Sequence, residues 1–388
     1  MYISAPKLTT EGGSLIASAD FSTSQMKSVL WFRLDATYRD CILLERGDAF
    51  LIGLLLHAMA LGEDIYLDCA MSEKLYYNLS QYLVPAFSLA NPSLQKVGIF
   101  PRSLDNAVLN TGKAVATGFS GGVDSFSTIH DHLVNPACPR NYRLTHLTFF
   151  NVGSHGDYGG DAARTLFKER CSILKGYPSD CGLEYIVIDS NISEILRRNY
   201  EETYTIRSMA PVLLLQKLFR TYYYSAGYRM DEFILTTFDM ALYDLLNTAM
   251  LSTESVSIYS TGCQYTRVEK TAMIADYEPT WQYLNVCACR HGNCSTCFKC
   301  LRTLLTLDIL GKLNNYGRVF DLCAYRRCRN RYIAHVLANS TQYFYKDIYR
   351  EMQRRSIHVP MFCRLSAWKH IGVSALRKYI YLGGMRHK

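Results

Sequence analysis

A stretch of six residues combines the side chains and the backbone freedom that phosphate binding requires. It consists of Ser120, Gly121, Gly122, Val123, Asp124 and Ser125, and we refer to it as the phosphate loop. The two glycines lack Cβ atoms, so backbone N–H groups can approach an anion closely. The serine hydroxyls add hydrogen-bond donors, and the carboxylate can orient the loop or bind Mg²⁺. These residue types therefore predict a site for a phosphate group.

The segments on either side of the phosphate loop predict a strand and a helix. Residues 114–119 form a short, mostly apolar run, and residues 123–133 are amphipathic. A helix that begins directly after a strand and a glycine turn points its N–H groups and its positive dipole end at one spot. No Gly-Lys-Ser/Thr or Gly-x-Gly-x-x-Gly pattern is present, which excludes a Walker A loop and a dinucleotide turn. The alternative is an incidental glycine-rich turn after a buried strand.

Five cysteines fall within fourteen residues: Cys287, Cys289, Cys294, Cys297 and Cys300. The last three form a Cys-x2-Cys-x2-Cys run, which suits tetrahedral thiolate ligation with one more ligand from just upstream. Cys287 and Cys289 compete for that place, and His291 is a further candidate. We expect a structural zinc ion, because the cluster leads directly into an apolar helix over residues 301–313. An iron–sulfur cluster and a set of unliganded buried thiols are the alternatives.

The composition describes an ordered globular protein with a localised positive charge. Of the 388 residues, 49% are hydrophobic and 20% are charged, and the formal net charge is +8. Residues 318–388 contain fifteen Lys and Arg against three acids, a net charge of +12, so the rest of the chain is near −4. This basic, partly aromatic tail predicts a nucleic-acid surface, solvated helix faces or a docking site for an acidic protein.

The start of the chain and its longest apolar run argue against secretion and membrane binding. Residues 1–10 lack a basic segment followed by an apolar one, so no secretory signal is visible. The apolar run over residues 49–62 is too short to cross a bilayer. Without a signal, the fourteen cysteines are expected to be reduced thiols. We therefore expect a cytoplasmic protein.

The pattern of elements predicts three parts: an N-terminal α+β domain over residues 1–105, a catalytic domain over 106–315 and a basic, mainly helical extension over 316–388. The first part has expected strands at 27–34, 41–45 and 64–69 and expected helices at 48–61 and 72–83. From residue 114 onward, strands and helices alternate, which implies a parallel sheet with helices on both faces. The expected strands are 114–119, 144–152, 183–189, 232–237 and 255–260, and the expected helices are 123–133, 160–175, 192–202 and 211–224.

Five further residues are candidates for a ligand site at the carboxyl ends of these strands. His155 follows the second expected strand, Arg207 precedes a long apolar helix, and Asp239 follows the fourth strand. Arg267 and Lys270 follow the last strand and are spaced to share one helix face. Each has a plainer alternative: a surface histidine, a solvated arginine, a turn aspartate and a solvated helix face.

The phosphate loop resembles the Ser-Gly-Gly-x-Asp-Ser loop of the ATP pyrophosphatase (PP-loop) superfamily. With the cysteine run, it makes residues 113–313 similar to the 7-cyano-7-deazaguanine synthases, whose zinc site has the same run with a first cysteine several residues upstream. The resemblance implies an adenine-nucleotide α-hydrolase-like fold with a five-stranded parallel sheet. It also implies zinc ligation by Cys287, Cys294, Cys297 and Cys300, and roles for Arg207, Arg267 and Lys270 near the ATP phosphates or the substrate.

The activity that this resemblance implies is carboxylate activation. ATP, with Mg²⁺, adenylates the carboxylate of a 7-deazaguanine-type acid and releases pyrophosphate. A nitrogen nucleophile then displaces AMP to give an amide, and a second round gives a nitrile. Housekeeping synthases have neither this N-terminal part nor this basic tail. We therefore expect a diverged relative from a bacterial antiviral defence system or biosynthetic operon, with a protein partner as one candidate acceptor. The alternatives are PP-loop sulfur or nitrogen transfer on tRNA and a non-enzymatic nucleotide-binding subunit of a larger complex.

Overall fold

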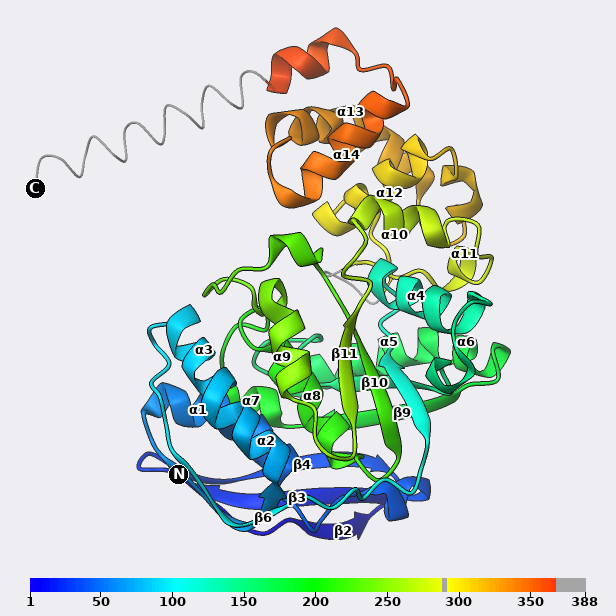
Figure 1. Cartoon of the computed structure of the whole chain (residues 1–388). Helices are drawn as coiled ribbons and strands as arrows, with labels where there is room; N and C mark the ends of the chain where they lie inside the picture. The colour runs from blue at the N-terminus through cyan, green and yellow to red at the C-terminus, as the bar shows by residue number, and fades with distance from the viewer. Residues whose placement is uncertain (288–291, 368–388) are drawn as a thin grey trace, which may run out of the picture. The chain divides into compact units, whose positions relative to one another are not determined.

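The chain packs as two compact units in the computed structural model, which describes residues 1–287 and 292–367 (Figure 1). The first unit contains residues 1–120 and 124–264, and the second contains residues 121–123 and the chain from residue 265 onward. Among the described helices, none is long and apolar enough to span a bilayer. The predicted division of the chain near residues 105 and 315 stays a prediction.

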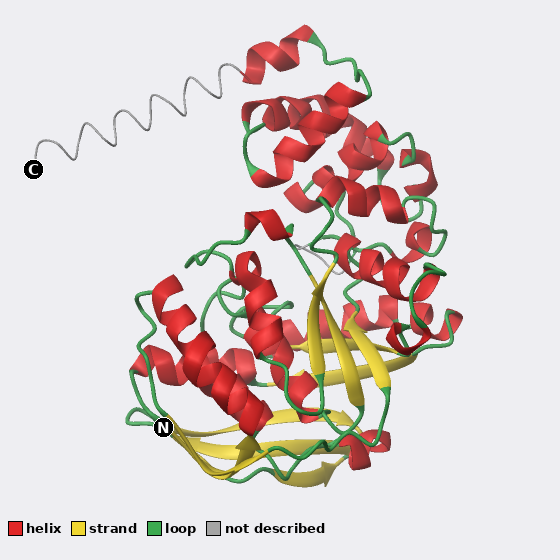
Figure 2. Ribbon diagram, in the orientation of Figure 1, coloured by secondary structure: helices red, strands yellow, loops and turns green. Residues whose placement is uncertain are grey.

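One mixed, 11-stranded sheet forms the centre of the first unit (Figure 2). Its spatial order is β11-β10-β7-β8-β9-β4-β3-β1-β5-β6, and β2 pairs with β3. The strands are β1 (Tyr2–Ile3), β2 (Lys7–Glu11), β3 (Ser14–Ser22), β4 (Lys27–Asp35), β5 (Ile65–Ser72), β6 (Ile99–Asp105), β7 (Ala114–Gly118), β8 (His146–Asn151), β9 (Glu184–Ser190), β10 (Phe219–Ser225) and β11 (Ser257–Thr261).

The prediction of a five-stranded parallel sheet is wrong for the sheet as a whole. β9, β8, β7, β10 and β11 are neighbours and run parallel. However, β9 also pairs antiparallel with β4, through Phe32 with Ser190 and Arg33 with Asp189. The Asn191 side chain extends this seam, since it accepts from the Trp31 N–H at 3.0 Å and donates to the Val29 carbonyl at 2.8 Å. The strands of residues 1–105 therefore enlarge the same sheet.

The fourth parallel strand was placed wrongly by the sequence pattern. Residues 232–237 contain no strand, and the strand in that position of the sheet is β10. The expected helix over 211–224 is also wrong, because α8 covers Tyr204–Leu214 and the chain then enters β10. β10 contains aromatic and β-branched residues, which favour a strand that packs between two neighbouring strands of the sheet. Residues 41–45 form no strand either, since Cys41 ends a short 3-10 helix.

The helices that cover the sheet begin near the expected positions. In Figure 1, α1, α8 and α9 lie on one side of the parallel strands and α4, α5 and α6 on the other. The helices of the first unit are α1 (Asp48–Leu61), α2 (Glu73–Asn78), α3 (Val84–Ala90), α4 (Val123–Ile129), α5 (Asp161–Leu174), α6 (Gly176–Asp180), α7 (Ile192–Leu196), α8 and α9 (Asp244–Met250). A turn of π-helix, His130–Val134, prolongs α4.

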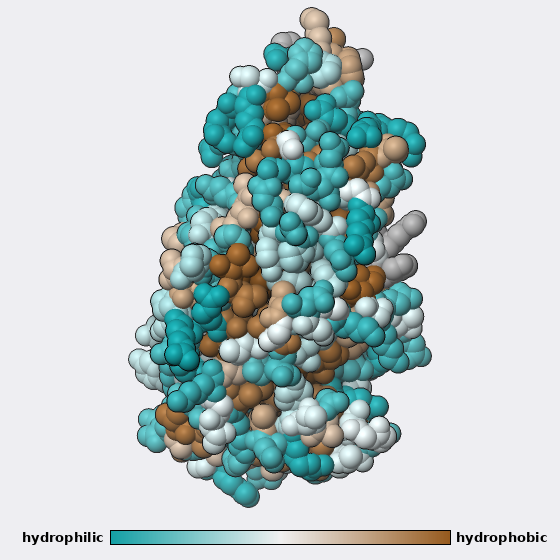
Figure 3. Space-filling model, turned by 90° about the vertical axis from the view of Figure 1, so that its right-hand side faces the viewer, coloured by the Kyte–Doolittle hydropathy of each residue, from teal (hydrophilic) through white to brown (hydrophobic). Residues whose placement is uncertain are grey.

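One hydrophobic core joins the N-terminal strands and the parallel strands. It includes Phe32 of β4, Phe50 of α1 and Ile186 of β9, all fully buried. α1 approaches β4 closely at Gly53, where an added Cβ would lie 2.7 Å from the Leu30 side chain. On the molecular face in Figure 3, hydrophobic residues form separate patches among hydrophilic ones. The continuity of the core explains why the N-terminal strands do not separate from the parallel ones.

The second unit is helical in its described part. Its helices include α10 (Arg267–Ile274), α11 (Thr280–Tyr283), α12 (Phe298–Ile309), α13 (Leu322–Ala338) and α14 (Tyr343–Arg354). Cys294 and Cys297 precede α12 and Cys300 lies in its first turn, so the helix begins three residues before the predicted start at residue 301. The expected helical character of residues 316–388 agrees with α13 and α14 in the described part, and residues 368–388 lie outside the described residues.

Candidate functional site

The phosphate loop follows β7, the strand at which the order of the parallel strands reverses. From β7 the chain continues to β8 and β9 on one side, and β10 and β11 are added on the other. Gly121 has φ +72°, a left-handed conformation that favours glycine. Ser120 is exposed, whereas Val123 and Ser125 are buried. The loop thus has the local geometry that was predicted, at the switch point where α/β sheets bind ligands.

Three aromatic rings support the strand and the helix next to this loop. Phe119, Phe126 and Tyr177 are buried, and their ring centroids lie 4.9–5.3 Å apart. Phe119 also donates its backbone N–H to the Thr148 carbonyl of β8 at 2.8 Å. Such packing fixes the point at which the chain leaves β7, so the loop begins from a rigid base.

Polar contacts fix α4 and its extension against the neighbouring strands. The Thr128 and Ser225 hydroxyls are 2.8 Å apart, and His132 Nε2 lies 3.1 Å from the Thr261 hydroxyl. The His132 ring stacks on Tyr223 with centroids 3.8 Å apart. Burial lowers the pKa of His132 to about 4, so the imidazole is neutral near pH 7. These contacts hold the helix next to the carboxyl ends of β10 and β11.

The residue types of the loop suit a phosphate group. Left-handed Gly121 allows a tight turn without a Cβ, and Ser120 is an exposed residue. Asp124 lies in the first turn of α4, where its carbonyl accepts from the Ser127 hydroxyl at 2.9 Å. Its carboxylate is an oxygen ligand of the kind that Mg²⁺ prefers.

Arg207 is fully buried in α8. Its guanidinium donates to the Asp157 carbonyl at 2.9 Å, the Arg198 carbonyl at 2.7 Å and the Ser193 hydroxyl at 3.2 Å. Burial lowers the pKa of Arg207 to about 10, and the group stays charged near pH 7. These bonds tie the loop after β8 to α7, which favours a structural role over the predicted contact with substrate.

His155 and Asp239 are also engaged by protein groups. The buried His155 ring makes T-shaped contacts with Phe149 and Phe167, and burial lowers its pKa to about 3. Asp239 accepts from the Tyr204 hydroxyl at 2.5 Å and the Tyr228 hydroxyl at 2.8 Å, and it caps a short 3-10 helix. The histidine is therefore a neutral core residue, and the aspartate serves as a turn residue.

Arg267 and Lys270 lie on α10, the helix that was expected after the last strand. Thr266 and Glu269 form a capping box, in which the Glu269 N–H donates to the Thr266 hydroxyl at 3.1 Å. Lys270 is buried, and the Arg267 guanidinium lies 5.7 Å from the Phe344 ring centroid. Both residues belong to the second unit, and their predicted approach to ATP phosphates stays a prediction.

The structure brings four of the predicted metal ligands together. The sulfur atoms of Cys287, Cys294, Cys297 and Cys300 all lie within 4.8 Å of one another. The Cys287–Cys297 and Cys294–Cys300 pairs are each 3.9 Å apart. Four sulfurs at the usual zinc–sulfur distance of 2.3 Å form a tetrahedron with edges of about 3.8 Å. The residues therefore fit a four-coordinate metal such as zinc. Cys289 and His291, the competing candidates, lie outside the described residues.

The turn after Cys294 stabilises the thiolate of that residue, whereas burial raises the pKa of Cys297 and of Cys300. Ser295 adopts φ +62°, which lets the Cys297 N–H point at Cys294 Sγ from 3.3 Å. Burial opposes ionisation of Cys294, but the N–H groups of Thr296 and Cys297 and nearby thiols lower its pKa to about 6. A deprotonated thiol is the form that ligates metal.

Sequence reasoning missed two residues that support this turn. Asn293 donates to the Leu284 carbonyl at 2.8 Å and accepts from the Val286 N–H at 2.9 Å. The Ser295 hydroxyl accepts from the Asp321 N–H at 2.8 Å. Asn and Ser next to cysteines are turn residues, and that preference was the available signal.

One hydrogen bond links the two predicted sites. Within the second unit, the Asn285 N–H donates to the Gly121 carbonyl at 2.7 Å. Asn285 lies two residues before Cys287, so the segment that enters the cysteine cluster is bonded to the phosphate loop.

No protein-family profile, curated protein or solved structure matches the chain.

Proposed function

We propose that the chain uses ATP to adenylate a carboxylate and then transfers the acyl group to a nitrogen nucleophile. The observation that carries this proposal is the position of the phosphate loop at the switch point of the parallel strands. In α/β sheets, ligands bind outside the carboxyl ends of the strands at such a switch point. The Ser-Gly-Gly-x-Asp-Ser pattern specifies cleavage between the α and β phosphates in the superfamily that it resembles.

The proposed reaction has two steps. A carboxylate oxygen attacks the α-phosphorus, the bond to the bridging oxygen between the α and β phosphates breaks, and pyrophosphate leaves with that electron pair. The nitrogen nucleophile then attacks the acyl carbon, loses a proton, and AMP leaves with the carbon–oxygen electron pair. The N–H groups and hydroxyls of the loop would stabilise the negative charge that develops on pyrophosphate. Asp124 would hold Mg²⁺ against the phosphates.

The metal centre has a structural role in this proposal. Four cysteine ligands leave zinc no open coordination position for a substrate. Bound zinc would fix the start of α12 and, through the Asn285–Gly121 hydrogen bond, restrain the phosphate loop. The pairing of this centre with the loop is what favours a 7-deazaguanine-type acid as the substrate, by the resemblance to the synthases.

The products of ATP turnover test the proposal. The full chain is incubated with ATP, Mg²⁺, ammonia and 7-carboxy-7-deazaguanine, and the nucleotides are separated by chromatography. We expect AMP and pyrophosphate, and we expect Asp124→Ala and Ser120→Ala each to lower the rate by a factor of about 10²–10³. Asp40→Ala, which changes an exposed carboxylate outside the loop, is the matched control and should keep the rate. Formation of ADP and phosphate would refute the mechanism.

A further inference from the structure

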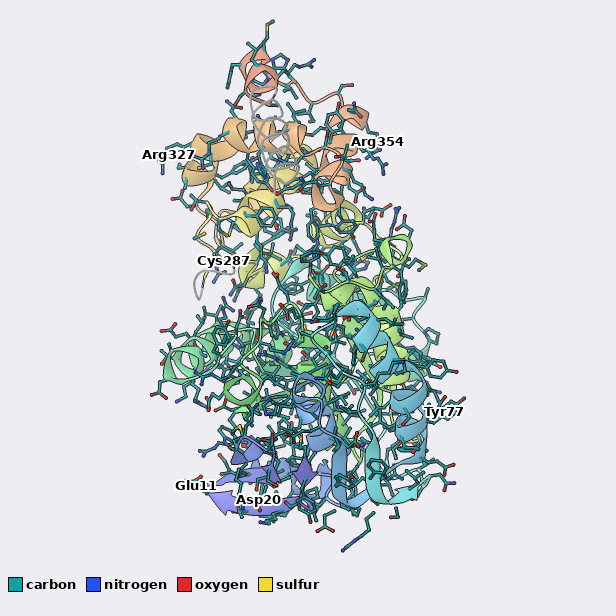
Figure 4. All side chains as sticks on the ribbon, turned by 90° about the vertical axis from the view of Figure 1, so that its left-hand side faces the viewer. Glu11, Asp20, Tyr77, Cys287, Arg327 and Arg354 are labelled. Atoms are coloured by element: carbon teal, nitrogen blue, oxygen red, sulfur yellow. The ribbon has the colours of Figure 1, made fainter. Side chains whose placement is uncertain are left out.

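Three arginines of α13 form a surface that no acid neutralises. Arg326, Arg327 and Arg331 are exposed, and none makes an ion pair or a side-chain hydrogen bond with the part of the chain that is described. We refer to them as the α13 arginine surface. Figure 4 shows the labelled Arg327 side chain on the outer side of the second unit.

The other arginines of α13 and α14 are paired with acids, which sets the α13 arginine surface apart. Arg329, on the same helix, is ion-paired with Asp308 at 2.5 Å. On α14, Arg354 and Arg355 both contact Glu351 at 2.6 Å, and Arg350 lies 3.6 Å from Asp347. In Figure 4, Arg354 lies on the opposite side of the unit from Arg327. Among the arginines of α13 and α14, those without an acidic partner are therefore the three of the α13 arginine surface.

The charge of the whole segment points in the same direction. Residues 265–388 carry 21 Lys and Arg against seven acids, a net charge of +14, whereas residues 1–264 carry 21 against 27, a net charge of −6. A separation of this kind attracts polyanions to one part of the chain and repels them from the other. An exposed guanidinium without an acid keeps its hydrogen-bond donors available for phosphate oxygens.

We propose that the α13 arginine surface binds the phosphate backbone of a nucleic acid. From Arg326 to Arg331 the helix rises about 7.5 Å, at 1.5 Å per residue. This is roughly two phosphate steps of one DNA strand, which are 3.4 Å apart along the axis. All three side chains are arginine, whose planar fork matches a phosphate in two hydrogen bonds.

The composition of α13 argues against the two other polyanionic partners. Membrane-surface helices insert apolar side chains next to their cations, and α13 contributes no large exposed hydrophobic residue. Tight protein interfaces likewise depend on buried aromatic or aliphatic anchors, which this face lacks. Charge without apolar anchors is the pattern of backbone binding to nucleic acids. The proposal does not depend on ATP chemistry, so it can fail while the proposed function holds.

Binding of a labelled duplex to the full chain tests the proposal. Fluorescence anisotropy with a 20-base-pair DNA duplex is measured over a range of salt concentrations for two triple variants. Arg326→Gln/Arg327→Gln/Arg331→Gln removes the α13 arginine surface, and Arg350→Gln/Arg354→Gln/Arg355→Gln removes the same number of charges from the paired set. We expect the first variant to lose at least tenfold in affinity at low salt. Its slope of log K against log salt should be smaller by about 2.7, or 0.9 for each lost contact.

The control variant separates a site from general charge attraction. It should keep the slope to within about one unit, because its arginines are already paired with acids. Circular dichroism and zinc content confirm that both variants fold. Equal losses in the two variants would overturn the proposal, as would binding of phosphatidylserine vesicles or of a polyglutamate peptide in preference to the duplex. Binding of an RNA duplex with the same loss in the first variant would support it.

Discussion

Replacement of Cys300 by serine should remove the metal and destabilise the second unit. Cys300 is fully buried at the start of α12, with its sulfur 3.9 Å from that of Cys294. Serine keeps the size of the side chain but offers a hydroxyl in place of a thiolate. The matched control is Cys323→Ser, which changes an exposed cysteine of α13 outside the cluster. The comparison isolates ligation from the loss of a thiol.

The expected magnitude follows from linkage between metal binding and folding. If free zinc is about 1,000 times the dissociation constant, binding contributes about 4 kcal/mol to the free energy of unfolding. Because Cys300→Ser leaves only three thiolates and should lose the metal, it should lose this whole contribution of about 4 kcal/mol. For a unit of this size, that loss lowers Tm by roughly 10 °C. Cys323→Ser should change the free energy by no more than about 0.5 kcal/mol.

Scanning calorimetry and metal analysis together check this prediction. We expect about one zinc ion per wild-type chain and per Cys323→Ser chain, and much less in Cys300→Ser. A chelator should lower the Tm of the wild type toward that of Cys300→Ser and leave Cys300→Ser itself unchanged. If the wild type carries no metal, or if both cysteine variants melt at the same temperature, the assignment of the metal centre is refuted.

Two further predictions concern buried charges of the first unit. Arg207→Met should lower the free energy of unfolding by about 3 kcal/mol in urea titrations, because it leaves the Asp157 and Arg198 carbonyls without their donor; unchanged stability with lost ATP turnover would instead restore a role at the substrate. Burial raises the pKa of Asp48 to about 6, although its oxygens accept from Gln216 and the Ser72 N–H. Between about pH 4 and 6, Asp48 therefore keeps in the folded state a proton that it has released in the unfolded state. The free energy of unfolding should consequently fall by up to roughly 3 kcal/mol as pH rises through this window. Asp48→Asn should flatten that dependence, and parallel curves for the two proteins would contradict it.

Local signals in the sequence were sufficient for the phosphate loop and the cysteine cluster. Glycines after an apolar run and thiols at fixed spacing act over a few residues, so pattern alone locates them. β10 was missed because its apolar residues directly follow those of α8, and the two runs read as one helix. Helix and strand cannot be separated in a short apolar run without knowing its neighbours.

The sequence did not indicate which distant segments pair as strands, or whether a single charged side chain is buried or exposed to solvent. Nothing local in β4 indicates that Phe32 pairs with Ser190 of β9. The same limit applies to Arg207, whose residue type and position in the sequence suit a phosphate site as well as a buried structural role. Two of its three acceptors are backbone carbonyls, one in the loop after β8 and one after α7, and backbone carbonyls leave no trace in the sequence.

The seam between β4 and β9 has a consequence for synthesis of the chain. β4 is made roughly 150 residues before β9, so at 5–20 residues per second its edge waits about 8 to 30 s for a partner. During that time the strand presents unpaired backbone groups next to the hydrophobic residues Leu30 and Phe32, which is a template for pairing with other nascent chains. We therefore expect aggregation during translation to depend on this edge more than on the stability of the finished sheet. Slower elongation through residues 36–183 should lower the yield of folded protein.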